Sequence, residues 1–172
     1  MEKWDILNSD GEPTGRTTLR GQCKFKPGEY HLVVHIWVVS SKGELLIQRR
    51  SENKKLMPGE WAATGGAAIS GEDSYTAANR ELYEELGIPS NKYNLKKLAR
   101  IKRRNSLLDI WCINTDIKIE KLRLQKSEVA AAKWVDLNKL KSMIENGEFH
   151  NYGSEYFDTV FSKIEDLRGA TV

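Results

Sequence analysis

The sequence has little of what marks the unusual protein classes: of its 172 residues, two are cysteine and four are proline. Cys23 and Cys112 are too few and too far apart for a disulfide framework or a metal knuckle, which favours a reducing, cytoplasmic location. Residues 32–39 form the longest apolar run, but His35 interrupts it, and it falls far short of the roughly 20 residues that cross a bilayer. The first residues carry no basic patch followed by an apolar stretch, so we expect neither a signal peptide nor a membrane anchor.

What the sequence does contain is ordinary for a globular protein. Hydrophobic residues make up 40% and charged residues 30%, and we find no internal repeat and no low-complexity tract. A chain of this length buries about 70% of the surface that it exposes when unfolded, and therefore needs no disulfide or structural metal. We expect a single domain over residues 1–172, with a short N-terminal strand hairpin and a C-terminal helix included.

The net charge of +3, from 27 basic and 24 acidic residues, is too small to indicate a nucleic-acid partner. Basic residues do gather at positions 96–104, but they alternate with Leu98 and Ile101, as in a strand with one wet face. No aromatic residues are interleaved there for base stacking, so nucleic-acid binding is not expected. A small-molecule partner is favoured, and a homodimer is left open.

Hydrophobic periodicity predicts a mixture of strands and helices. Residues 31–39 are almost continuously apolar and rich in valine, which is typical of a central strand covered on both faces. Further strands are expected at 4–7, 15–18, 45–49, 98–104, 107–119 and 131–135, and helices at 73–86, 136–145 and 154–167. In the first helix Tyr75, Ala78, Leu82 and Leu86 make one apolar stripe, and Gly87 ends it.

This helix carries three glutamates on one face. Glu81, Glu84 and Glu85 fall within an arc of about 100° at 100° per residue. Two carboxylates about 4 Å apart repel by about 4 kcal/mol at an effective dielectric near 20, so a positive charge is expected beside them. Arg80 can pair with only part of the cluster, and a divalent cation could supply the rest. Ligands that are all oxygen favour Mg²⁺ or Mn²⁺ over Zn²⁺.

The wider pattern resembles a known family. Gly66, Glu72, Arg80-Glu81-Leu82, Glu84-Glu85-Leu86 and Gly87-Ile88 match the complete Nudix box at every specified position. The residues Pro58 to Trp61 before the box, and Glu128-Val129 with Lys133 to Asp136 after it, are similar to flanking features of the same superfamily. The resemblance implies an α/β fold, the Nudix α/β/α sandwich with a mixed β-sheet.

The resemblance also assigns roles to the box residues. Glu81, Glu84 and Glu85 would be metal ligands, with the carbonyl of Gly66 completing the inner shell and Mg²⁺, or Mn²⁺ in its place, as the ion. Glu72 would pair with Arg80 and so tie the loop to the helix. The implied reaction is hydrolysis of a diphosphate bond in a small molecule, usually a nucleoside diphosphate linked to another group. The general base could be Glu84 or Glu85, or Glu128 from outside the box.

A second branch of the fold offers a rival. The stretches at 28–32, 48–51 and 58–61 look like the corresponding parts of isopentenyl diphosphate isomerases, which move a proton at carbon. Those enzymes need a cysteine after the tryptophan and a histidine shortly beyond, and residues 62–68 contain neither. A non-catalytic module that senses a nucleotide is a third reading, which the complete glutamate set argues against.

Outside the box, six residues are candidates for binding the substrate. The basic ones stand where a diphosphate could be met, Trp61 could stack on a base, and His31 matches a position near the isomerase metal site. These candidates are Arg49, Arg50, Lys54, Lys55, Trp61 and His31.

Overall fold

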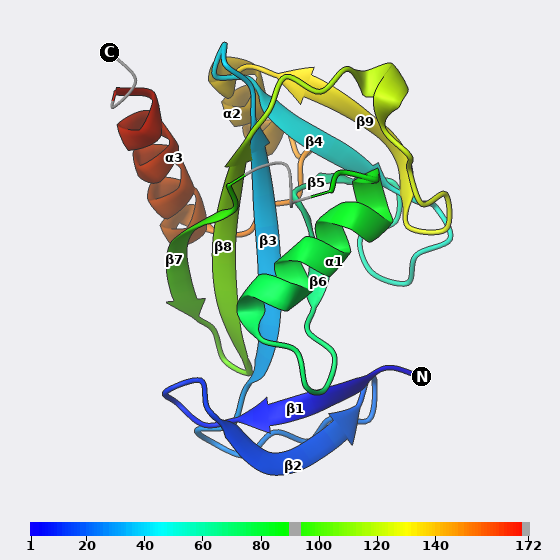
Figure 1. The fold of residues 1–172 in the computed structure, drawn as a ribbon, viewed down its shortest axis with the longest axis vertical. Helices are drawn as coiled ribbons and strands as arrows, with labels where there is room; N and C mark the ends of the chain where they lie inside the picture. Colours follow the sequence, from blue (N-terminus) through cyan, green and yellow to red (C-terminus); the bar gives the residue numbers. More distant parts are fainter. Residues whose placement is uncertain (90–93, 170–172) are drawn as a thin grey trace.

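The computed structural model describes residues 1–89 and 94–169. Its elements in chain order (Figure 1) are β1 (Lys3–Leu7), β2 (Pro13–Leu19), β3 (His31–Val39), β4 (Leu45–Arg50), β5 (Trp61–Ala62), β6 (Thr64–Ala67), α1 (Ser74–Leu86), β7 (Lys96–Lys102), β8 (Ser106–Asn114), the 3₁₀ helix η2 (Ile119–Lys121), β9 (Val129–Val135), α2 (Leu137–Glu145) and α3 (Ser154–Gly169).

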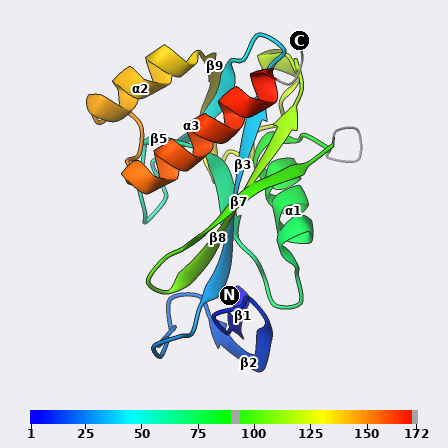
Figure 2. The ribbon, with the colours of Figure 1, turned by 90° about the vertical axis from the view of Figure 1, so that its left-hand side faces the viewer.

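The main sheet is mixed and lies between helices. Its strands follow the order β5-β4-β3-β8-β7, while β6 pairs with β3 and β9 pairs with β4. The pair β3–β8 is parallel, and the other pairs in this sheet are antiparallel. Helix α1 covers one face, whereas α2 and α3 cover the other (Figure 2). The expected α/β/α sandwich with a mixed sheet is confirmed. Strands β1 and β2 form a separate hairpin at one end of the molecule (Figure 1).

Strand β3 is the centre of the core, as its valine-rich sequence predicts. Alternate residues of β3 belong to two hydrophobic clusters, because side chains of a strand point to opposite faces. Val34, Ile36 and Val38 pack against α1, and Trp37 and Val39 pack on the side of α2 and α3. The sheet is therefore fixed from both sides, and its strands are rigid supports for side chains at their ends.

Helix α1 starts and stops where capping residues allow. The Asp73 carboxylate accepts a hydrogen bond from the backbone N–H of Thr76 at 2.7 Å, and Gly87 adopts a left-handed φ of 71° that ends the helix. Leu82 and Leu86 are fully buried, as expected. The expectation for Tyr75 is wrong: it is 49% exposed, and its ring meets the edge of Trp111 at 5.7 Å. Its place in the core is taken by Ala77.

The strand expected at 107–119 ends early, at Asn114. The N–H of Thr115 still reaches the carbonyl of Val39, but the Asp116 carboxylate then accepts from the Ser41 N–H at 2.8 Å. The chain turns away at this point and forms η2. The short strands β5 and β6 were not expected, since two and four residues are too few for a periodic signal.

The basic run at 96–104 has a structural use. Lys97 and Arg100 of β7 point toward β8 and hold the fully buried Asp109, with Nζ–Oδ2 2.7 Å and Nε–Oδ1 2.6 Å. Burial alone would raise the pKa of Asp109, but the hydrogen bonds from Arg100 and Lys97 outweigh it and lower the pKa. Part of the basic run thus neutralises an internal carboxylate.

Two smaller findings concern the other features of the sequence. Cys112 is buried, and burial raises the pKa of its thiol to about 12, which makes it unreactive. Among residues 1–89 and 94–169, no helix has the length and apolar character needed to cross a membrane.

Candidate active site

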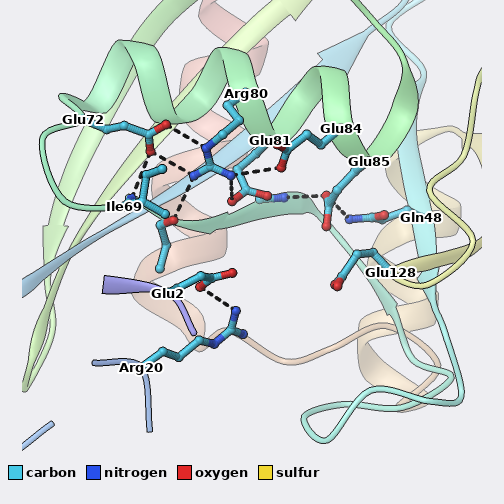
Figure 3. A network of polar contacts seen from close by, with 12 residues as sticks. Glu2, Arg20, Gln48, Ile69, Glu72, Arg80, Glu81, Glu84, Glu85 and Glu128 are labelled. Atoms are coloured by element: carbon cyan, nitrogen blue, oxygen red, sulfur yellow. Dashed lines mark hydrogen bonds and ion pairs between the residues drawn. The ribbon is translucent and has the colours of Figure 1, made fainter. Parts of the chain in front are cut away.

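The three glutamates of α1 differ in exposure although they share one face. The side chains of Glu81 and Glu84 are 13% and 47% exposed, whereas Glu85 is buried at 3%. All three are directed toward the space below the helix, next to β6 and β4 (Figure 3). Within about one helical turn, the carboxylates therefore range from the buried Glu85 to the solvent-exposed Glu84.

Glu85 is held by groups from two strands. Its Oε2 accepts from Gln48 Nε2 at 2.7 Å and from the Gly65 N–H at 3.1 Å. Burial raises the pKa of Glu85 to about 8, the charge of Glu81 adds to this rise, and the two hydrogen bonds oppose it. Close to neutral pH the carboxyl is thus able to carry a proton in the absence of a cation.

The glycine pair of β6 lets the strand approach the helix closely. A Cβ at Gly66 would lie 2.3 Å from Oε1 of Glu81, and a Cβ at Gly65 would lie 2.1 Å from the carbonyl oxygen of Val34. Neither position can take a side chain unless its neighbours move. The register Val34↔Gly66 with β3 fixes this approach, so the backbone of Gly66 stands beside Glu81.

Arg80 links the loop before the helix to two of the glutamates. Its Nε and Nη2 donate to the Glu72 carboxylate at 2.7 and 2.9 Å, and Nη1 donates to Glu81 at 2.8 Å and to Glu84 at 3.1 Å. Its Nη2 also donates to the carbonyl of Ala67 at 3.1 Å. Burial raises the pKa of Glu72, but the bonds from Arg80 and from the Ile69 N–H outweigh it and lower the pKa. The pair joins loop and helix (Figure 3).

The donor set suits a hard divalent cation, and Arg80 stands in for one. Its Nη1 bridges Glu81 and Glu84, which shows that these two carboxylates can share a positive charge. Within residues 1–89 and 94–169 no three acidic, histidine or cysteine side chains converge in a metal-binding arrangement. The reason is visible in the contacts: Arg80 draws Glu81 and Glu84 to one side, and Gln48 and Gly65 draw Glu85 to the other. All the donors are oxygens, as Mg²⁺ and Mn²⁺ prefer.

Glu128 lies opposite the helix, and its carboxylate is directed into the same space (Figure 3). It forms an ion pair with Lys54 of the 51–60 loop, and the loop is also fixed by a bond from the Ser51 N–H to the Glu128 carbonyl at 2.8 Å. The structure thus brings Glu128 and Lys54 together with the box residues.

The remaining basic candidates, Arg49, Arg50 and Lys55, lie in different places. In β4 Gln48 and Arg50 share one side of the strand, because they are two residues apart. The Arg50 side chain donates from Nε to the Leu56 carbonyl at 3.1 Å, and its charge lowers the pKa of Glu85. Arg49 points to the other side, where Nε donates to the Gly59 carbonyl at 2.9 Å and Nη2 pairs with Glu52 at 3.0 Å. Lys55 is exposed in the loop.

The aromatic and histidine candidates are occupied by packing. Trp61 is half-buried, with Lys133 Nζ 4.1 Å from its ring centroid. His31 is stacked between Trp4 at 4.4 Å and Phe25 at 5.5 Å, and burial lowers its pKa to about 4. A histidine packed in this way is neutral at physiological pH and serves as part of a hydrophobic stack.

His35 is a core histidine, 8% exposed. Its Nδ1 is 2.9 Å from the hydroxyl of Tyr156, which also accepts from Trp37 Nε1 at 3.0 Å. Burial lowers the pKa of His35 to about 3.

Three residues of the site were missed by the sequence analysis. Gln48 is a buried polar residue in an apolar strand, and the two-residue period of β4 could have directed attention to it. Glu2 and Arg20 belong to the N-terminal hairpin; in Figure 3 Glu2 lies below the box glutamates, and Arg20 lies on the far side of Glu2. No sequence signal relates that hairpin to the box, since their contact forms only in the fold.

The comparison with protein families decides the identity of the fold: the NUDIX domain matches residues 29–155. The chain belongs to the Nudix hydrolase family. It is 40% identical over 153 residues to an uncharacterized Nudix hydrolase of Listeria monocytogenes, and the match covers 88% of this chain and 90% of the relative. A crystal structure of DR0079 from Deinococcus radiodurans superposes with a TM-score of 0.75 at 25% identity, covering 87% of this chain and 93% of that one.

Members of this family act on phosphorus anhydrides, and this Nudix chain is accordingly an enzyme of the hydrolase class. The isomerase branch is also similar: an isopentenyl-diphosphate Delta-isomerase of Pectobacterium atrosepticum is 32% identical over 84 residues. That match covers 48% of this chain and 46% of the isomerase, far less than the hydrolase match. The strand where the isomerase resemblance requires a cysteine and a histidine holds the glycine pair instead.

Proposed function

We propose that this Nudix enzyme hydrolyses a diphosphate bond in a small molecule, a nucleoside diphosphate linked to another group, and that it requires Mg²⁺ or Mn²⁺. The observation that carries the proposal is the single face of α1 that bears Glu81, Glu84 and Glu85, on which Glu81 and Glu84 share the guanidinium of Arg80. An excess of carboxylates over cations suits a diphosphate hydrolase, because a bound metal would supply the missing positive charge.

Glu81, Glu84 and Glu85, with the backbone carbonyl of Gly66, would hold the metal. When bound, Mg²⁺ neutralises phosphate oxygens and lowers the pKa of water. Glu72 keeps Arg80 at the side of the cluster through a bidentate pair, which fixes the orientation of loop and helix before substrate arrives.

Glu128 is the proposed general base, with Glu84 and Glu85 as the other candidates. Its carboxylate faces the open side of the cluster and accepts the proton of the attacking water as the water adds to phosphorus. Lys54, now paired with Glu128, and Arg50, whose charge acts on Glu85, would offer positive charge to the phosphate oxygens. Among the six predicted substrate residues, these are the two that we propose for the role.

The class of substrate also bears on the binding partner and the location of the enzyme. We propose a small-molecule ligand for this site. We propose that the enzyme works in the cytoplasm. A homodimer remains compatible with this arrangement.

The test is phosphorus NMR of the purified protein with Mg²⁺ and a panel of nucleoside diphosphate sugars, dinucleoside polyphosphates, nucleoside triphosphates and isopentenyl diphosphate. Protein-free and metal-free samples serve as blanks. Glu85→Gln should abolish turnover, whereas Glu145→Gln, at the exposed end of α2, should not change it. Metal-dependent cleavage of one class supports the proposal and names the substrate. Allylic isomer formation without cleavage would replace it with isomerisation, and binding without turnover would replace it with nucleotide sensing.

A further inference from the structure

The N-terminal hairpin is fastened to the loop of the Nudix box. The Ser70 N–H donates to the carbonyl of Lys3 at 2.7 Å, and the Asp5 carboxylate accepts from Ser70 Oγ at 2.6 Å and from the Gly71 N–H at 2.8 Å. These bonds fix β1 alongside the segment between β6 and α1. The start of β1 therefore lies beside the loop that leads into α1, although this hairpin precedes the 29–155 range matched by the family.

Two charged residues of the hairpin form an ion pair, of which Glu2 is on the side of the box glutamates (Figure 3). Arg20 Nη1 donates to Glu2 Oε2 at 2.8 Å, and the Arg20 N–H donates to the Glu2 carbonyl at 2.9 Å. In Figure 3 the Glu2 carboxylate lies between the guanidinium of Arg20 and the box glutamates. The pair is thus part of the electrostatic surroundings of the site.

The placement of Glu2 needs a reason, since a further carboxylate near Glu81 is unfavourable by itself. Its contacts give one: Glu2 holds Arg20 through side chain and backbone, and the guanidinium lies 6.0 Å from the ring of Trp4. The Arg20 side chain is nevertheless 48% exposed, and its described side-chain hydrogen bond uses Nη1 only. It is positioned and still open to a ligand.

The other cations at the site already have partners. Arg80 donates to Glu72, Glu81 and Glu84, Lys54 is paired with Glu128, and Arg50 Nε donates to the Leu56 carbonyl at 3.1 Å. A diphosphate brings at least two negative charges to a face that is already acidic, so it gains most from a cation with donors to spare.

We propose that Arg20 binds a phosphate group of the substrate, and that Glu2 is the positioning residue that directs Arg20 to the site. The proposal rests on the proposed diphosphate chemistry of the same site. The hairpin would then form one side of the active site. Arg20 would bind the phosphate group that extends from the metal site toward β1 and β2.

The experiment compares the wild type with Arg20→Ala, Arg20→Lys and the control Arg16→Ala. Arg16 belongs to the same hairpin, is 51% exposed and is paired with Glu29, so it matches Arg20 in exposure and pairing. Two quantities are measured with Mg²⁺ present. One is KM and kcat on the cleaved member of the substrate panel. The other is the Kd of methylenediphosphonate, a diphosphate analogue with an uncleavable P–C–P bridge, by calorimetry.

We expect Arg20→Ala to raise KM and the Kd of methylenediphosphonate about tenfold, equivalent to about 1.4 kcal/mol, while kcat stays within about twofold. Arg20→Lys should recover part of the loss, and Arg16→Ala should match the wild type. Glu2→Gln should raise KM less than Arg20→Ala and leave the Mg²⁺ requirement unchanged.

Three results would overturn the inference: a Kd for Arg20→Ala within twofold of the wild type, an equal loss in Arg16→Ala, or a wild type that does not bind methylenediphosphonate. A changed Mg²⁺ requirement in Glu2→Gln with an unchanged Kd would also contradict it, because Glu2 would then act on the metal. If Arg20→Ala weakens methylenediphosphonate binding but the wild type cleaves nothing, the phosphate site stands and the hydrolase proposal fails.

Discussion

The protonation of buried Glu85 leads to an unusual expectation: removing its charge should stabilise the protein when no metal is present. The pKa of Glu85 is about 8, against 4.5 for an ordinary glutamate. At pH 7 the unfolded chain is ionised at this position and the folded chain is mostly protonated. With 1.36 kcal/mol for each pKa unit, the interval from 4.5 to 7 amounts to about 3 kcal/mol of lost stability.

Glu85→Gln removes this loss while keeping the shape of the side chain. The amide oxygen can accept the bonds from Gln48 and from the Gly65 N–H that Oε2 now accepts, although a neutral oxygen accepts them less strongly. We therefore expect the variant to have a free energy of unfolding about 1–3 kcal/mol above that of the wild type at pH 7 in EDTA. Urea unfolding followed by tryptophan fluorescence measures the difference.

The pH dependence of this difference gives its sign a second check. A carboxyl whose pKa is raised by folding supports stability at low pH, and this support is lost as the pH rises from 4.5 toward 8. The advantage of Glu85→Gln should thus shrink below about 1 kcal/mol at pH 5. Added Mg²⁺ should stabilise the wild type and not the variant. A variant that is less stable than the wild type in EDTA at pH 7 would refute this reasoning.

Three further outcomes are expected. Glu128→Gln should lower kcat by about 10²-fold with an unchanged Mg²⁺ requirement, and an unaltered kcat would remove Glu128 as the base. Glu72→Ala leaves the half-buried guanidinium of Arg80 without its bidentate partner, so thermal unfolding should reveal a loss of about 1–3 kcal/mol, absent in Glu145→Gln. His35 has a pKa of about 3, so the unfolded chain gains a proton below pH 6.5 that the folded chain refuses. Between pH 7 and pH 5 this proton should lower the free energy of unfolding of the wild type by about 2 kcal/mol. The free energy of unfolding of His35→Gln should therefore depend less steeply on pH, and equal slopes in the two proteins would contradict the burial argument.

The sequence predicted most of the fold because its signals are local. The Nudix box lies within the 23 residues from Gly66 to Ile88, and the helix within it has its own caps and apolar stripe. Strand β3 could be placed at the centre because its residues are apolar on both faces, which is typical of a strand that is covered on both sides. These features need no knowledge of distant residues.

The parts that the sequence did not reveal depend on contacts between distant segments. Gln48 is ordinary in its strand, and it becomes part of the site only because β4 carries it to Glu85. Glu2 and Arg20 acquire meaning when Asp5 fastens the hairpin to the box loop. Tyr75 had the right spacing for the core, but the first turn of α1 lies at its rim. Periodicity reports which face is apolar and not where the neighbouring element ends.

The buried Asp109 also determines how the protein should respond to polyanions. Of the six basic residues between Lys96 and Arg104, Lys97 and Arg100 are committed to Asp109. A nucleic acid that approached this edge would therefore release counterions for at most four side chains, which gives a slope of log K against log salt no steeper than about −4. Such binding would weaken quickly as the ionic strength rises. Because Lys97 and Arg100 pair with the buried Asp109, this edge of the sheet is a poor binding site for nucleic acid.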